Sequence, residues 1–253
     1  MRRFFVFFVV VLAGAGMVSA QTVESAERSA RTDTTVSCYN PFGWEVGVYG
    51  GITLNTLSTY VGYMTNVQYA PAFGNTLGID VTYGLRKWLA VRADLALTQK
   101  NNTLLHYVYY ESTNNGETTL DSASFGTNSV NRYVNLPVVL DFSFGGKARF
   151  HAYFGGYIGY WIDGHRSGGS LPVLGSEGEF NAPYEFNKVR DNRFDAGMAY
   201  GLGLSFLCWN HFDISFEMHL YYALTDMQKN YMLNMNPRYN TTTTLQLGLA
   251  YKF

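Results

Sequence analysis

The residues best placed for chemistry in this sequence are Asp163, His165, Ser167 and Ser170, which lie within eight positions of one another. A serine activated by a histidine that an acid orients is the arrangement of nucleophilic hydrolases. A segment rich in Gly and Ser also produces such a cluster by chance, so we predict no catalytic residues. No metal-ligand spacing, phosphate loop or Ca²⁺ loop is present, and we expect no bound metal and no cofactor.

The other candidate residues are charged side chains that fall on one side of an alternating pattern. In Phe212–Leu220 the apolar positions are every second residue, and Asp213, Glu217 and His219 alternate against them. A period of two places successive side chains on opposite faces of a strand. Eight stretches show this pattern, which predicts one apolar face and one charged face on each strand.

The charged face is expected to point into a closed barrel whose interior is filled by side chains. Buried charges must pair with one another, so we predict an interior polar network with a structural role. In this network Glu45, Asp80, Arg92 and Asp94 are expected neighbours, and His151 faces the same way. The predicted members are Glu45, Asp80, Arg92, Asp94, Asp141, Glu217, His219 and Lys252.

The elements that would position these residues are eight strands joined by short and long connections in strict alternation. This alternation is typical of transmembrane barrels, where short turns face the periplasm and long loops face outside. We therefore predict an all-β fold, an eight-stranded antiparallel up-and-down transmembrane β-barrel with short periplasmic turns and four long extracellular loops. A soluble exported sandwich is the alternative. The expected strands cover residues 43–54, 76–85, 88–98, 132–144, 149–162, 194–207, 211–224 and 242–253, and the expected long loops cover residues 58–75, 99–131, 163–193 and 226–241.

The two ends of the sequence favour export and insertion into the cell outer membrane. Residues 1–20 have a basic start, an apolar run and a small-residue site before Gln21, which predicts a cleaved signal peptide. A retained membrane helix is the alternative, although the apolar run is shorter than the ~20 residues that a span needs. Residues 21–41 are polar and are expected to be a disordered periplasmic lead-in to a barrel domain at 42–253. The last strand ends in Tyr251 and Phe253, which we interpret as a signal to the barrel assembly machinery.

Composition agrees with an exported barrel. Only 15% of residues are charged, 17% are aromatic, and the net charge of -1 gives no reason to expect nucleic-acid binding. Trp44, Trp88 and Trp209 lie at expected periplasmic strand ends, which predicts an aromatic girdle at the bilayer boundary; ordinary core tryptophans are the alternative. Cys38 and Cys208 would both lie at the periplasmic end, and whether they form a disulfide is left open.

The long loops are where a function would reside. Residues 103–111 and 117–125 flank Asn114-Asn-Gly-Glu117, a hairpin signal that predicts a ribbon protruding from the membrane. Such a ribbon could pair with a protein partner by strand addition, or it could only make a long loop rigid. Residues 231–239 are unusually apolar for an exposed segment, which suggests contact with lipopolysaccharide or a partner.

Five stretches resemble the PorT-like outer-membrane β-barrel proteins of Bacteroidota-type bacteria. They are Tyr133–Phe144 with its central Pro137, the Gly-rich Ala152–Tyr160, Phe194–Gly203, Tyr221–Met227 and Gly248–Phe253. Ala223 and Asp226 depart from the family pattern, where Gly and Asn are expected. The resemblance implies an eight-stranded barrel, and because the named family member takes part in protein secretion, it implies a role in secretion as one option.

The expected function is therefore a structural or surface-interaction role in the outer membrane, exerted through the extracellular loops. An accessory of an outer-membrane secretion system and an enzyme that modifies lipid A or phospholipids are the alternatives. Expected partners are outer-membrane lipid and lipopolysaccharide, the barrel assembly machinery during biogenesis, and a protein partner at the ribbon.

Overall fold

The computed structural model describes residues 43–59, 67–114, 117–169, 179–209, 211–229 and 237–253. The predicted signal peptide, the lead-in, Cys38 and residues 231–236 of the apolar loop lie outside these ranges. No helix in the described part of the chain is long and apolar enough to cross a membrane. The strands are β1 (Trp44–Thr59), β2 (Val67–Arg86), β3 (Leu89–Gln99), β4 (Asn102–Asn114), β5 (Glu117–Gly145), β6 (Ala148–Gly169), β7 (Glu179–Pro183), β8 (Phe194–Trp209), β9 (Phe212–Ala223) and β10 (Arg238–Lys252).

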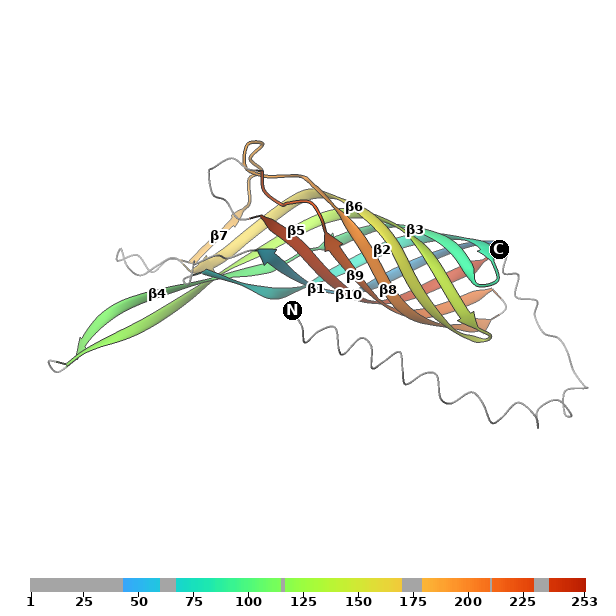
Figure 1. Ribbon diagram of the computed structural model, residues 1–253, viewed down its shortest axis with the longest axis horizontal. Coiled ribbons are helices and arrows are strands. Elements are labelled where there is room, and N and C mark those ends of the chain that lie inside the picture. The colour runs from blue at the N-terminus through green and yellow to red at the C-terminus, as the bar shows by residue number, and fades with distance from the viewer. Residues whose placement is uncertain (1–42, 60–66, 115–116, 170–178, 210, 230–236) are drawn as a thin grey trace, which may run out of the picture. The chain divides into compact units, whose positions relative to one another are not determined.

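The strands close into an antiparallel ring of eight, as predicted (Figure 1). β3 and β4 are successive segments of one strand, because both pair with β5 in the same register. The ring runs β1, β2, β3 with β4, β5, β6, β8, β9 and β10, and β10 pairs with β1 from Glu45↔Lys252 to Thr59↔Arg238. β7 adds a short strand to the extracellular end of β6.

The strands are longer than predicted at their extracellular ends. β2 begins at Val67 instead of residue 76, and β5 begins at Glu117 instead of residue 132. Above the bilayer both faces of a strand meet water, so the alternation of apolar and polar residues that marks the lower segments is lost there. Much of the predicted loop 99–131 is the predicted ribbon: β4 pairs with β5 from Asn102↔Ser129 to Asn114↔Glu117 and extends away from the barrel (Figure 1).

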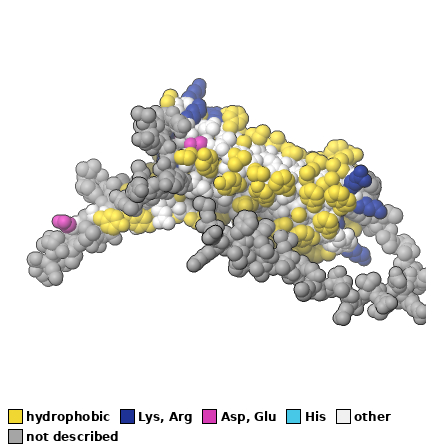
Figure 2. Space-filling view, viewed as in Figure 1, with side chains coloured by type: hydrophobic (Ala, Val, Ile, Leu, Met, Phe, Trp, Pro, Cys, Tyr) yellow, Lys and Arg dark blue, Asp and Glu magenta, His cyan; other side chains and the backbone are white. Residues whose placement is uncertain are grey.

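The outer face of the barrel is apolar. Figure 2 shows hydrophobic side chains over the barrel wall and Lys and Arg side chains near its ends. The prediction that no outward position carries a charge is wrong at Arg132, which projects outward from β5 and pairs with Asp163 of β6 at 2.6 Å. Arg132 lies where the apolar band ends, so both side chains reach the polar boundary of the bilayer.

Pro137 of β5 faces the interior of the barrel and causes no register shift against β3. β3 and β5 keep one register on both sides of it, from Ala93↔Val138 to Ala96↔Asn135, and only the intervening pairs are missing. Proline lacks the N–H that a ladder hydrogen bond requires, so the effect is local. The register shift of β5 against β6 lies at Arg132/Tyr133 instead.

A positive charge on the outer face should destabilise the barrel according to its depth. Leu247 of β10 and Leu224, just beyond β9, are 62% and 61% exposed, but only Leu247 lies near the middle of the apolar band. Leu247→Arg is expected to lower the free energy of unfolding by about 2–4 kcal/mol and Leu224→Arg by about 0–1 kcal/mol. Urea unfolding of the protein in lipid vesicles measures both; equal losses would contradict the placement of the band.

Candidate functional site

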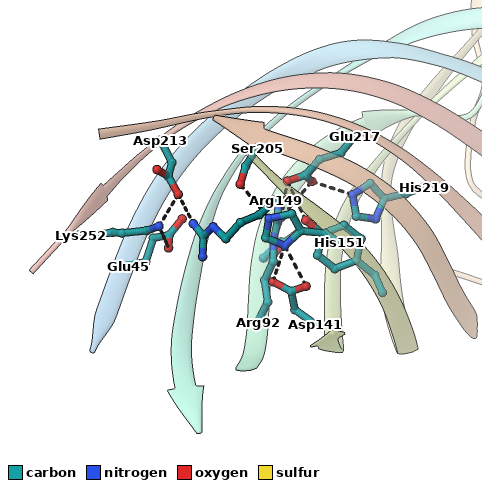
Figure 3. Close-up of polar contacts among 12 residues, drawn as sticks. Glu45, Arg92, Asp141, Arg149, His151, Ser205, Asp213, Glu217, His219 and Lys252 are labelled. Carbon is teal, nitrogen blue, oxygen red and sulfur yellow. Dashed lines mark hydrogen bonds and ion pairs between the residues drawn. The ribbon is translucent and has the colours of Figure 1, made fainter. Parts of the chain in front are cut away.

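The interior of the barrel holds charged side chains from all parts of the ring (Figure 3). Arg92 of β3 is 5% exposed and lies at the centre of the largest group. Its Nε donates to Asp94 Oδ1 at 2.8 Å, and its Nη1 donates to both carboxylate oxygens of Glu217 at 2.9 Å. Asp80 of β2 lies 3.7 Å from Nη2. One guanidinium therefore joins three carboxylates from β2, β3 and β9 across the lumen.

Aromatic rings hold this guanidinium from two sides. Its carbon lies 5.7 Å from the centre of the Tyr49 ring and 5.4 Å from that of Tyr153, in the range of cation–π contact. Glycine makes room for Tyr49: a Cβ on Gly78 would lie 2.6 Å from its ring. The small and large residues thus pack together in the lumen.

Glu217 is the most connected acid of this group. Besides Arg92, it accepts hydrogen bonds from Tyr153 Oη at 3.0 Å and from Gln246 Nε2 at 3.0 Å, and His219 Nε2 lies 2.8 Å from it. Glu217 and His219 are two positions apart on β9, so the strand itself places them on the same face. Both side chains are buried.

A second group closes the periplasmic end. Asp213 of β9 pairs with Arg149 of β6 and with Lys252 of β10, and Lys252 also lies 3.6 Å from Glu45. Glu45 thus contacts Lys252, whereas the sequence had placed it beside Asp80 and Arg92. Arg149 and Asp213 were absent from the predicted network, although both lie on the inward register of their strands.

A third pair lies toward the extracellular end. Lys100 Nζ donates to Asp195 Oδ2 at 2.6 Å, and both residues are buried. Asp195 also accepts from Tyr157 Oη at 3.1 Å and from Asn240 Nδ2 at 3.2 Å. Lys100 falls within the predicted loop 99–131, so this pair is not predicted from the sequence. The alternation of side chains could have revealed it, because Lys100 continues the even-numbered positions that face inward, as Arg92 and Asp94 do.

Asp141, His151 and Ser205 form a buried chain of hydrogen bonds near the periplasmic end. His151 Nδ1 lies 3.0 Å from both oxygens of Asp141, and its Nε2 lies 2.8 Å from Ser205 Oγ. This order of groups matches that of a serine hydrolase triad. The adjoining cavity has a volume of about 60 Å³, however, and the backbone of Ser205 is paired with β6 and β9, so its amides are not arranged as an oxyanion hole.

The sequence cluster Asp163, His165, Ser167 and Ser170, which was judged a chance occurrence, is not assembled in this way. His165 Nε2 contacts Asn181 of β7, and the carboxylate of Asp163 pairs with Arg132. Ser170 lies outside the described residues. His165 is exposed.

Trp44 and Trp88 of the predicted girdle, and Tyr251 and Phe253 of the predicted assembly signal, lie on the outer face at the periplasmic end. Trp44 is 56% exposed and contacts Tyr83, with ring centres 4.8 Å apart, and Trp88 is 47% exposed. The side chain of Trp209 lies outside the described set. Tyr251 and Phe253 contact each other with ring centres 5.0 Å apart, and Phe253 N donates to Trp44 O at 3.0 Å, which fixes the C-terminal residue to β1.

A ring of eight antiparallel strands with an apolar exterior and an ion-paired interior defines an eight-stranded outer-membrane β-barrel. The family model described as "Outer membrane protein beta-barrel domain" matches residues 20–229, so the chain belongs to that family and is located in the outer membrane. No curated protein sequence matches the chain.

Solved structures similar to this chain are also outer-membrane proteins. Ail of Yersinia pestis is 15% identical, with 84% of this chain and 99% of that chain covered and a TM-score of 0.39. OprG of Pseudomonas aeruginosa is 13% identical, with 84% and 96% covered and a TM-score of 0.45. AlkL, solved in DMPC bilayers, is 15% identical, with 88% and 95% covered and a TM-score of 0.45.

Proposed function

We propose that this protein is a non-conducting outer-membrane barrel that acts at the cell surface through its extracellular ribbon, Asn102–Phe125. The proposal rests on two features taken together: ion pairs cross the lumen, and β4 and β5 form a long ribbon outside the barrel. Ion pairs span the lumen at three levels, which leaves no reason to expect free passage of solutes. The ribbon, in contrast, extends beyond the rest of the barrel.

The ribbon is suited to strand addition. Within the described residues, positions 107–114 of β4 pair with β5 alone, and positions 117–126 of β5 pair with β4 alone. Among the described residues, each strand therefore has one edge without a backbone partner, which is the template that an added strand uses. Tyr109 is 55% exposed and offers a contact for such a partner.

The test uses a photo-reactive amino acid at Tyr109 in intact cells. A protein adduct is expected at this position, and the cross-linked protein should no longer co-purify with a barrel in which Asn-Gly replaces residues 109–122, a change that retains the Val108↔Ala123 pair above the barrel. Heat-modifiable migration on gels verifies that the shortened variant still folds. Adducts with lipid alone would contradict the proposal, and a stoichiometric secretion component would favour the PorT-like accessory role.

We also propose that the barrel is not an enzyme, and the Asp141–His151–Ser205 chain gives the sharpest test. The cavity beside Ser205, about 60 Å³, is far below the ~300–1,000 Å³ of small-molecule pockets, so we expect no substrate to reach Ser205. A fluorophosphonate probe is expected to leave Ser205 unmodified by mass spectrometry of the folded protein. Modification that His151→Gln abolishes would overturn this expectation and indicate hydrolase activity.

A further inference from the structure

A cavity of about 280 Å³ opens at the extracellular mouth of the barrel, above the Lys100–Asp195 pair. Its walls come from β1, β2, β4, β5, β6, β10 and the segments 184–192 and 227–228. This volume is just below the ~300–1,000 Å³ of small-molecule pockets. The residues that matter here are arginines and aromatic residues, namely Tyr69, Tyr133, Trp161, Arg166, Tyr184 and Arg238.

A register shift in the wall aims Arg166 into this cavity. β6 pairs Trp161 with Tyr133 but Asp163 with Arg132, so Ile162 is an extra residue. Below the shift, even-numbered residues of β6 such as Ile158 face outward; above it, Arg166 faces inward and Asp163 faces out. Bulges of this kind redirect side chains and occur next to functional sites.

The cavity has more positive than negative side chains. Its described lining contains three arginines, Arg166, Arg190 and Arg238, and one aspartate, Asp191. Asp191 is already engaged: it pairs with Arg190 at 2.8 Å and accepts from Tyr184 Oη at 2.8 Å. Hydrogen bonds from Arg190 and Tyr184 and from the Asn187 amide hold its pKa below the usual value, against the opposing effect of burial. Asp191 therefore stays ionised and is not available to the other two arginines.

Arg166 and Arg238 rest on aromatic rings instead of carboxylates. The guanidinium carbon of Arg166 lies 3.9 Å from the centre of the Tyr184 ring, and that of Arg238 lies 5.4 Å from the Tyr69 ring. Neither has a carboxylate of the described chain within 4.0 Å. Burial raises the pKa of Tyr69, and the charges of Arg238 and Arg166 both oppose that rise, so the two cations act on the same region of the cavity.

The cavity also holds an unmet hydrogen-bond acceptor. Gln228 Oε1 is buried without a partner among the described residues, although buried polar atoms are normally hydrogen-bonded. Because this oxygen is buried, a hydroxyl group of a ligand reaches it only when the Gln228 side chain turns toward the cavity. Guanidinium groups bind phosphate or carboxylate in bidentate fashion, and the aromatic walls provide apolar surface for a ring.

We propose that this cavity binds a small acidic sugar, a saccharide that carries a phosphate or carboxylate group. The anionic group lies between Arg166 and Arg238, and a hydroxyl donates to Gln228. Such a ligand can come from the sugars of lipopolysaccharide or from free saccharide in the medium. The site includes Asn102 and Leu104 at the base of the ribbon, but it does not depend on the role of the ribbon's outer part.

The test is calorimetric titration of the refolded full-length barrel in detergent with glucose 6-phosphate and with glucuronate, using glucose and inorganic phosphate as comparison ligands. The acidic sugars are expected to bind at least tenfold more tightly than either comparison ligand, and more weakly as salt is raised. The double variant R166Q/R238Q should reduce the affinity for acidic sugars at least tenfold. The matched control is Arg132→Gln, which removes an arginine from the outer wall and should leave the affinity unchanged.

Three outcomes would overturn the proposal: equal binding of glucose, equal binding of inorganic phosphate, or unchanged affinity in R166Q/R238Q when gel migration verifies folding. The source of the ligand is tested by competition. If purified lipopolysaccharide displaces glucose 6-phosphate, the membrane itself supplies the sugar; if it does not, while the acidic sugar binds as expected, the ligand is a free saccharide.

Discussion

Arg92→Met is expected to lower the free energy of unfolding by about 3–5 kcal/mol, the cost of leaving buried charges without their partner. Arg92 is the shared cation of Asp80, Asp94 and Glu217, and no second cation contacts all three in the described lumen. Methionine retains much of the length and apolar volume of the stem, so the loss reports mainly the charge. Urea unfolding in lipid vesicles, followed by the fraction of heat-modifiable protein on gels, measures it.

The matched control for this variant is Arg132→Met. Arg132 also forms a short ion pair, but its side chain is 61% exposed at the end of the apolar band, and exposed pairs contribute about 0–1 kcal/mol. If the two variants lose the same stability, water must reach Arg92 in the lumen, and the proposal of a closed, non-conducting barrel fails with it.

The register of the strands could be predicted from the sequence because the bilayer imposes it. A charged residue on the lipid-facing side costs energy at every depth of the apolar band, so alternation in Phe212–Leu220 indicates which face of the strand is inside. The predicted network residues Asp80, Arg92, Asp94 and Glu217 consequently meet in the lumen. The short turns that join the strands were predictable for the same reason, since they interrupt the pattern.

The pairing across the lumen could not be predicted. Arg92 and Glu217 are 125 positions apart, and their heights in the barrel depend on the stagger of strands around the ring, which no local pattern encodes. Glu45 was placed with Asp80 because β1 and β2 are consecutive, whereas Lys252 lies opposite it on β10, the strand that closes the ring. Arg166 illustrates a second obstacle: one extra residue at Ile162 reverses which side chains face inward, and nothing in the local sequence marks the shift.

Removing either charge of the Lys100–Asp195 pair should lower the free energy of unfolding by about 3–5 kcal/mol. One of the two single variants should lose more stability than the other. After Lys100→Met, Asp195 keeps the hydroxyl of Tyr157 and the amide of Asn240 as donors. After Asp195→Asn, Lys100 keeps mainly the ring faces of Tyr133 and Tyr157, at 4.9 and 4.7 Å. Because Lys100 is fully buried, Asp195→Asn is expected to be the more destabilising change.

The double variant K100M/D195N separates the ion pair from the packing around it. It removes both charges, so its loss of stability should be smaller than the sum of the two single losses, by a coupling free energy of about 0.5–3 kcal/mol. Urea unfolding of all four proteins in the same vesicles completes the cycle. Additive losses would show that the two charges do not stabilise each other, and the extracellular level of the lumen would then be held by its tyrosine and asparagine side chains alone.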